Sequence, residues 1–225
     1  MGFKSVAIDG PAGAGKSTLA RQAAKALGFL YVDTGAIYRT VALQTLKSGV
    51  DAGDPAQVVP LLANLDIRMD YGPDGEQRMF LNDEDVSQAI REHQVSGLAS
   101  KVAAIPEVRA FLLDFQHKQA REHNVLMDGR DIGTVVLPGA DVKIFLTAAP
   151  ESRAKRRVLD LEQRGQTADF ATILQDIIQR DEQDRNRPIA PLRQAEDAVL
   201  LDTTHLNLAE SLQAMLSIIK EKIDL

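Results

Sequence analysis

The sequence contains no cysteine. Disulfides, thiolate metal sites and a cysteine nucleophile are therefore excluded, which fits a reducing compartment. No apolar run approaches the roughly 18 residues that suggest a membrane span. The N-terminus also lacks a charged segment followed by an apolar one, so we expect no signal peptide. These absences favour a cytoplasmic protein with no membrane partner.

An excess of basic residues is missing as well. The chain has 26 lysines and arginines against 32 aspartates and glutamates, a formal net charge of −6. Because proteins that coat nucleic acid usually carry a basic excess, we expect no nucleic-acid partner. The 225 residues are enough to bury a sizeable core. Nothing in the sequence demands a partner chain, so we expect a monomer.

Strand-like and helix-like segments alternate along most of the chain, which is typical of a parallel sheet covered by helices. The expected strands of this sheet cover residues 5–8, 29–32, 125–127, 142–146 and 198–201. Apolar residues at helical spacing predict a first helix over 16–27 and a last helix over 208–222. The sequence therefore predicts an α/β fold.

The region between about 55 and 100 breaks this alternation. Ile67, Met69 and Tyr71 alternate with polar residues, the turn residues of 72–75 follow, and 79–81 supply a return strand. This pattern predicts a β-hairpin in a small inserted subdomain. Pro106 is expected to begin the helix that resumes the main fold.

The stretch DGPAGAGKST, residues 9–18, contains the phosphate-binding loop pattern G-x-x-x-x-G-K-[ST]. Its glycines let backbone N–H groups point inward, and the helix that follows adds the positive end of its dipole. Lys16 can reach the β- and γ-phosphates, and the Ser17 hydroxyl can ligate Mg²⁺. A glycine-rich turn without a ligand would leave Lys16 unexplained. The expected residues for a nucleoside triphosphate are Gly10, Pro11, Ala12, Gly13, Ala14, Gly15, Lys16, Ser17 and Thr18.

A phosphate-binding loop alone does not name a reaction, because motors, GTPases and small-molecule kinases all use one. The sequence has no Asn-Lys-x-Asp guanine motif, and its negative charge argues against a motor with a basic track. Compact kinases for a small acceptor are left. Three stretches rich in arginine and carboxylate can distinguish them: 33–39 (DTGAIYR), 128–134 (DGRDIGT) and 180–188 (RDEQDRNRP). The first two follow expected strands, where ligands of open α/β sheets bind.

With these stretches the sequence resembles the bacterial-type cytidylate kinases, in the nucleoside monophosphate kinase group of P-loop proteins. The resemblance covers essentially the whole chain, because all these segments come in the family's order. It implies a P-loop kinase with a parallel five-stranded sheet flanked by helices, an inserted acceptor-binding subdomain with a small antiparallel sheet, and a short helical lid. The implied boundaries are 1–35, 105–147 and 188–225 for the core, 36–104 for the acceptor region and 148–187 for the lid.

The resemblance also implies transfer of the γ-phosphoryl group of MgATP to CMP or dCMP, in pyrimidine nucleotide metabolism. The residues expected at the acceptor's monophosphate are Thr34, Arg39, Arg130 and Arg187. Those expected at the cytosine ring are Ser100, Arg109 and Asp131, and those expected at the ribose are Arg180 and Asp184. Catalysis is assigned to Lys16, Arg130, Arg157 and Arg187. Mg²⁺ is assigned to Ser17 and to Asp128, which would bind it through water or cap the loop.

The segment after residue 146 predicts a helix with Arg153, Arg156 and Arg157 on one face. It resembles a lid that closes over ATP; otherwise it is a solvated helix paired with Asp160 and Glu162. Four other residues have simpler interpretations. Asp9 braces the loop, Tyr31 belongs to the core and Lys143 is a surface charge, while Asp33 caps the next helix or orders the acceptor site.

Two other functions stay open. A kinase for a small alcohol acceptor would use Asp33 as its base, but it would leave Arg39, Arg130, Arg180 and Arg187 without enough anionic charge to bind. An ATP-binding regulatory module without transfer would leave the whole acceptor constellation unused. Turnover that depends on an acceptor would exclude this second alternative.

Overall fold

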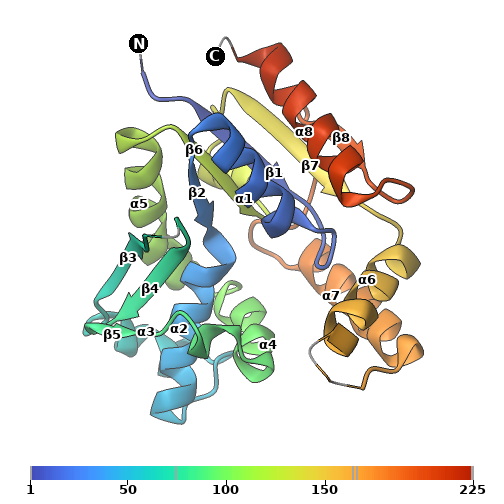
Figure 1. Cartoon of the computed structure of the whole chain (residues 1–225). Helices are drawn as coiled ribbons and strands as arrows, with labels where there is room; N and C mark the ends of the chain where they lie inside the picture. Colours follow the sequence, from blue (N-terminus) through green and yellow to red (C-terminus); the bar gives the residue numbers. More distant parts are fainter. Residues whose placement is uncertain (1, 74, 164, 166, 224–225) are drawn as a thin grey trace. The chain divides into compact units, whose positions relative to one another are not determined.

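The structure is a computed structural model that describes residues 2–73, 75–163, 165 and 167–223 (Figure 1). The chain divides into two compact units, one of residues 1–31 and 122–225 and one of residues 32–121. Each unit is described by itself. The division into core, acceptor region and lid that the sequence suggests stays a prediction. Within the described part of the chain, every helix is too short or too polar to span a membrane.

The main sheet confirms the expected α/β fold. Its five strands lie in the order β2-β6-β1-β7-β8, and the strand pairs β1–β6, β1–β7 and β7–β8 are parallel. The strands are β1 (Ser5–Asp9), β2 (Leu30–Asp33), β6 (Val125–Gly129), β7 (Val142–Thr147) and β8 (Val199–Asp202). In this register Asp9 at the end of β1 lies opposite Gly129 at the end of β6. The segments that follow these two strands therefore leave the same edge of the sheet.

One face of this sheet is covered by α1 (Lys16–Leu27) and α8 (Leu208–Lys222). Both helices begin and end where the sequence predicts. Leu19 and Ala23 of α1 and Met215 and Ile219 of α8 pack on the buried strand residues of one hydrophobic core. Strands buried on both faces read as apolar runs, which is why this pattern identified the sheet.

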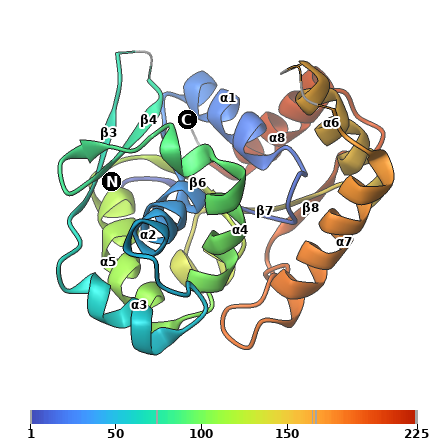
Figure 2. The ribbon, with the colours of Figure 1, turned by 90° about the horizontal axis from the view of Figure 1, so that it is seen from below.

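Two helices of the first unit, α6 (Pro150–Gln163) and α7 (Phe170–Asn186), lie side by side (Figures 1 and 2). A short π-helical turn, η2 (Ile132–Val136), follows β6. The buried positions of α7 are Ile177, Asp181 and Asp184. They stand at spacings of four and three residues, so one side of α7 packs inward with two carboxylates.

The second unit contains the antiparallel hairpin that the sequence predicts. Its sheet has the order β3-β4-β5, with β3 (Ile67–Tyr71), β4 (Gln77–Leu81) and β5 (Glu84–Asp85). Asn82 and Asp83, between β4 and β5, both have positive φ angles, which suits the Asn/Asp chemistry of tight hairpin turns. The helical elements are α2 (Thr34–Ser48), α3 (Pro55–Leu62), η1 (Ala89–Arg91), α4 (His93–Val102) and α5 (Pro106–Glu122). Pro106 begins α5, as expected, and α2 packs against α4 (Figure 2).

Candidate active site

The phosphate-binding loop connects β1 to α1, and its glycines are required by the backbone. Gly10 has a φ of 151°, and a Cβ atom there would collide with the carbonyl oxygen of Leu146, near the C-terminal end of β7. Gly15 has a φ of 87° immediately before α1 begins. Side chains other than hydrogen are strained at both positions. The motif is thus a consequence of the path that the chain must take between strand and helix.

Lys16 bends back over this loop. Its side chain is buried, and Nζ donates a hydrogen bond of 2.8 Å to the carbonyl of Pro11. Burial and the nearby charge of Arg130 lower the pKa of Lys16 to about 7. A polyanion bound beside the ammonium would raise this pKa and keep the group charged.

Ser17 and Asp128, the two residues expected to hold Mg²⁺, lie in contact. The Ser17 hydroxyl donates to Oδ2 of Asp128 at 2.9 Å, and the Tyr31 hydroxyl donates to Oδ1 at 2.9 Å. Hydroxyl and carboxylate oxygens are hard ligands of the kind that Mg²⁺ prefers, so this pair fits the ion. Among the described residues, no three histidine or acidic side chains gather as a metal-binding group. Mg²⁺ is usually held by one or two carboxylates together with substrate phosphates.

Tyr31 is a functional candidate that sequence reasoning missed. Its ring packs against the core, as expected, but its hydroxyl fixes the carboxylate that Ser17 also contacts. These two partners are 97 residues apart in sequence. Only the adjacency of β2 and β6 brings them together, and no local signal in the sequence reports it.

Asp9 braces the segment after β6. Its Oδ1 and Oδ2 accept hydrogen bonds from the backbone N–H groups of Ile132 and Gly133, both at 2.7 Å. Burial raises the pKa of Asp9 to about 6, although these two hydrogen bonds act in the opposite direction. The residue thereby ties the end of β1 to the turn that follows Arg130 and Asp131.

Four predicted acceptor residues of the first unit form two arginine–aspartate pairs. Arg130 donates from Nε to Asp184 at 2.8 Å, and Arg187 donates from a terminal nitrogen to Asp131 at 3.0 Å. Burial alone would raise the pKa of Asp184, but the charges of Arg130, Arg180 and Arg187 hold it below its ordinary value. The end of β6 and the end of α7 thus bring these charges together.

In the second unit, Asp33 caps the next helix, as one of its two expected roles requires, while a role in ordering the acceptor site stays a prediction. Oδ1 caps α2 by accepting from the N–H of Ala36 at 2.9 Å, and Oδ2 accepts from Arg39 at 2.9 Å. This double engagement disfavours Asp33 as the base of an alcohol kinase. Thr34, the first residue of α2, is buried beside this cap. Within the described residues, the buried Nε of Arg39 has no hydrogen-bond acceptor.

The expected base-reading residues of the second unit are Ser100 and Arg109. Arg109 on α5 is buried, and its Nη1 lies 3.4 Å from the carbonyl of Ala103. Its guanidinium carbon is 5.8 Å from the centre of the Tyr38 ring on α2. Ser100 is half-buried on α4, which packs against α2. Helices α2, α4 and α5 together carry these residues.

The three arginines of α6 have different environments. Arg153 is buried and contacts Asp181, and Arg156 donates to the backbone and side chain of Thr203. Arg157 is half-exposed and pairs with Asp160 at 3.3 Å. This pair is the contact expected of a solvated helix, so the catalytic assignment of Arg157 stays a prediction. Their spacing placed them on one helix face but did not indicate which would turn inward.

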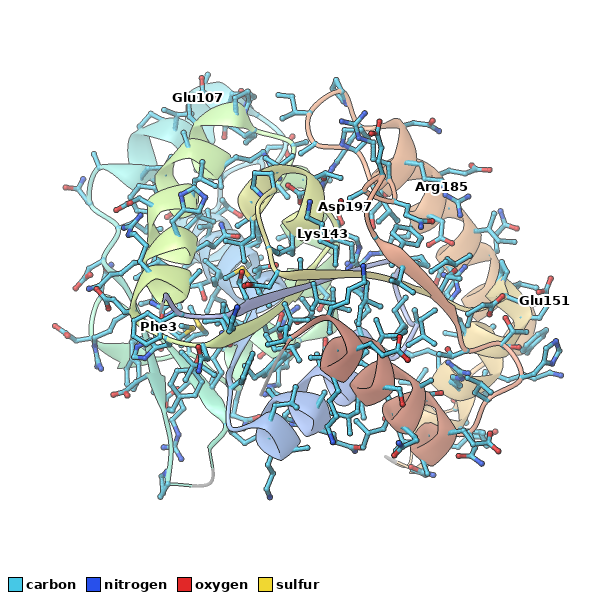
Figure 3. The ribbon with its side chains drawn as sticks, turned by 90° about the horizontal axis from the view of Figure 1, so that it is seen from above. Phe3, Glu107, Lys143, Glu151, Arg185 and Asp197 are labelled. Atoms are coloured by element: carbon cyan, nitrogen blue, oxygen red, sulfur yellow. The ribbon has the colours of Figure 1, made fainter. Side chains whose placement is uncertain are left out.

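The expectation that Lys143 is a surface charge is wrong. Its side chain is buried on β7, and Nζ contacts Asp197 at 2.9 Å (Figure 3). A Cβ atom on Gly133 would lie 3.1 Å from Cδ of Lys143, so the lysine stem lies next to the η2 turn. Its aliphatic stem is buried beside η2 while its ammonium is paired with an exposed carboxylate.

A family model described as "Cytidylate kinase" matches residues 6–221. The cytidylate kinase of Caldicellulosiruptor bescii is 48% identical, over 95% of this chain and 94% of the relative. That of Carboxydothermus hydrogenoformans is also 48% identical, over 97% and 98% respectively. Among solved structures, an uncharacterized protein from Eubacterium ventriosum matches 97% of this chain and 98% of its own, with a TM-score of 0.51 and 14% identity. This last likeness is one of fold alone.

Proposed function

Because the chain belongs to the cytidylate kinase family, we propose that it transfers the γ-phosphoryl group of MgATP to CMP or dCMP. The products are ADP and CDP or dCDP. One observation carries this proposal beyond family membership. The phosphate-binding loop after β1 and Arg130 after β6 leave adjacent parallel strands at the same sheet edge, because Asp9 lies opposite Gly129. This adjacency supports a site for two phosphate groups.

The donor is bound by the loop backbone, the N-terminus of α1 and Lys16. Backbone N–H groups and the helix dipole attract the β- and γ-phosphates. Ser17 and Asp128 hold Mg²⁺, which when bound neutralises charge on the phosphate oxygens. Tyr31 keeps the Asp128 carboxylate in place for this role.

The acceptor's phosphate is bound by Arg39, Arg130 and Arg187, whose planar guanidinium groups suit bidentate phosphate contacts. The orphaned Nε of Arg39 supports this role, because buried donors without an acceptor are rare in native proteins. Thr34 contributes at the same end.

The rest of the acceptor is recognised by hydrogen bonds of matching polarity. Asp131 accepts from the N4 amino group of cytosine, while Arg109 donates to its O2 and N3 atoms. Ser100 completes the contacts to the base, and Arg180 and Asp184 hold the ribose hydroxyls. Asp131 and Asp184 each accept a hydrogen bond from an arginine, and these contacts fix the orientation of the two carboxylates.

The chemistry needs no general base. The second pKa of a phosphate monoester is about 6, so the attacking oxygen of CMP is largely ionised at neutral pH. The difficulty is the approach of two polyanions, which Lys16, Arg130, Arg157 and Arg187 offset. An arginine that stabilises the charge of this transition state contributes about 10³–10⁵ in rate. Exclusion of water keeps the phosphoryl group from hydrolysis.

The decisive experiment measures ADP release from MgATP with CMP, dCMP, UMP, AMP, GMP or no acceptor in a coupled assay. We expect strong stimulation by CMP and dCMP, weak stimulation by the purine nucleotides, and slow turnover without an acceptor. Turnover that is the same with every acceptor and without one would refute the proposal and leave the alcohol kinase and the regulatory module as alternatives. The expected monomer is tested by size-exclusion chromatography with light scattering, which measures the molar mass of the protein in solution.

A further inference from the structure

Arg153 is the largest fully buried side chain of the structure and has no role in the transfer proposed above. Its guanidinium makes four hydrogen bonds. Nε donates to the carbonyl of Ala148 and one terminal nitrogen donates to the carbonyl of Ala12, both at 2.8 Å. The two terminal nitrogens also contact the two carboxylate oxygens of Asp181 at 3.1 and 2.5 Å. A guanidinium has five N–H donors, so most of its capacity is used within the protein.

These partners belong to three different segments. Ala12 lies in the phosphate-binding loop, Ala148 lies between β7 and α6, and Asp181 lies on α7. The loop also packs here, because a Cβ atom on Gly13 would lie 3.6 Å from Cβ of Arg153 and 4.0 Å from Cδ1 of Ile177. Arg153 therefore fastens the donor loop to α6 and α7 at one point.

The inward side of α7 continues from this point to the acceptor residues. Asp181 binds Arg153, and Asp184, one turn further along, binds Arg130 at 2.8 Å. Arg185, by contrast, lies on the exposed side of α7 (Figure 3). The two buried carboxylates thus connect one helix to the donor loop and to an acceptor arginine. Because packed interiors transmit strain, a displacement of the loop is passed along this helix.

We propose that Arg153 is a positioning residue that, through Asp181 and Asp184 on α7, aligns the donor-phosphate loop with Arg130. This proposal rests on the proposed phosphoryl transfer, which supplies the two phosphates to be aligned. The physical coupling consists of a contiguous set of buried ion pairs and one rigid helix. Arg153 itself touches neither substrate, because its side chain is only 2% exposed and most of its donors are occupied within the protein.

The test replaces the buried pair with apolar residues in the double variant Arg153→Met/Asp181→Leu. Exchanging both charges together avoids leaving one charge buried alone, and such exchanges are often neutral for stability. The matched control is Lys155→Met/Glu182→Leu, which makes the same changes of charge at exposed positions of the same two helices. Circular dichroism and thermal unfolding establish that each protein is folded.

We expect the double variant to lose about 10- to 100-fold in kcat, as when supporting residues are removed or reacting groups are misplaced by about 1 Å. The KM values for MgATP and CMP should each change by less than about threefold, since the binding groups are intact. The control should turn over like the wild type. A folded double variant with wild-type kcat, or with a loss confined to KM, would overturn the proposal.

Arg153→Lys decides the matter if the double variant does not fold. Lysine keeps the positive charge but cannot bond Ala12, Ala148 and both oxygens of Asp181 at once. We expect kcat to fall by about tenfold or more, again with little change in KM. Full activity of this variant would show that charge alone suffices, which contradicts a positioning role.

A second readout does not depend on transfer to any acceptor. Hydrogen exchange of the α7 backbone amides is measured with and without MgATP. In the wild type and the control, occupation of the loop should slow exchange in α7; in the double variant this protection should be lost. Equal protection in all three proteins would refute the coupling. If the wild type fails the acceptor assay but shows this effect, the transfer proposal falls and the coupling stands.

Discussion

The donor side and the acceptor side of the first unit are built from different parts of the polypeptide. The phosphate-binding loop depends on backbone geometry: Gly10 and Gly15 adopt positive φ angles, and Gly10 has no room for a Cβ atom. The acceptor side depends on side chains, in the pairs Arg130–Asp184 and Arg187–Asp131. A substitution at a glycine can damage the donor loop even though glycine has no functional side chain. On the acceptor side, single substitutions can remove one charged group at a time.

The largest effect is expected from Lys16→Ala, which removes the one charged side chain of the donor loop. We expect kcat to fall by about 10³-fold or more, because a charge placed at the transferring phosphoryl group is lost. The variant should stay folded, as circular dichroism can verify. Near-normal turnover would refute the role of the loop in transfer.

Gly10→Ala tests the backbone character of the donor side directly. The added methyl group collides with the carbonyl of Leu146, so the loop must move. We expect about a 10²-fold loss of kcat/KM for MgATP, as for a displacement of about 1 Å. The exposed Lys25→Ala on α1 is a suitable control. Unchanged MgATP kinetics in Gly10→Ala would break the distinction between the two sides.

Arg187→Ala tests the side-chain character of the acceptor side. We expect CMP binding to weaken by about 10- to 100-fold, because the variant loses a charge-assisted contact to the acceptor and the ion pair that orients Asp131. MgATP binding should change by less than about threefold. Separate calorimetric titrations of the two nucleotides measure this difference, and equal losses for both would contradict it.

Asp131→Ala sharpens the acceptor side further. If this carboxylate accepts from the amino group of cytosine, its loss should shift the ratio of CMP to UMP turnover by about tenfold. The ratio is informative because the effect on Arg187 applies to both nucleotides alike. A ratio equal to that of the wild type would exclude a base-reading role.

The smallest effect on turnover is expected at Asp9, which accepts hydrogen bonds from the turn that follows Arg130 and Asp131. Burial raises its pKa from 3.8 to about 6, so between these values the folded state binds more protons than the unfolded state. The contribution of Asp9 to stability is therefore fully present below pH 3.8 and is lost as the pH rises through 6. At about 1.4 kcal/mol for each pKa unit, this loss is about 3 kcal/mol.

The measurement compares urea unfolding of the wild type and Asp9→Asn between pH 4.5 and 7.5. The free energy of unfolding of the wild type, relative to the variant, should fall as the pH rises. A difference that is constant or increases with pH would show that the two backbone hydrogen bonds outweigh burial. The variant keeps the shape of the side chain but offers one acceptor oxygen instead of two, and this difference does not depend on pH.

The backbone side was predictable from the sequence and the side-chain pairing was not. The glycines of the loop, the apolar strands and the turn residues Gly72, Pro73 and Gly75 act locally, so their patterns predicted the sheet, the first helix and the hairpin. The partners of Lys143 and Tyr31 are 54 and 97 residues away. The pairing of Lys143 and the contact of the Tyr31 hydroxyl depend on strand order and on a distant loop. Local sequence patterns could therefore predict neither of them.

The arginine-rich stretch at residues 180–188 showed that charged residues gather there, but it did not show which of them form ion pairs. Residues 180–187 carry charges of both signs, yet nothing in their spacing indicates that Asp181 contacts Arg153 while Asp184 contacts Arg130. The family resemblance supplied roles toward the substrate. It could not supply these internal contacts, because they depend on how α6 and α7 pack.

At the start of α2, a single side chain contacts both the backbone of the helix and an arginine that we expect at the acceptor's phosphate. Asp33 fixes the first turn of the helix with one oxygen and the direction of Arg39 with the other. A Cβ atom on Gly35 would lie 2.9 Å from the guanidinium and 3.0 Å from the carboxylate, so a side chain at the intervening position would have to displace this ion pair. Asp33, Gly35 and Arg39 therefore constrain one another. A substitution that removes both oxygens, such as Asp33→Ala, would therefore change the stability of the helix and the environment of Arg39 together.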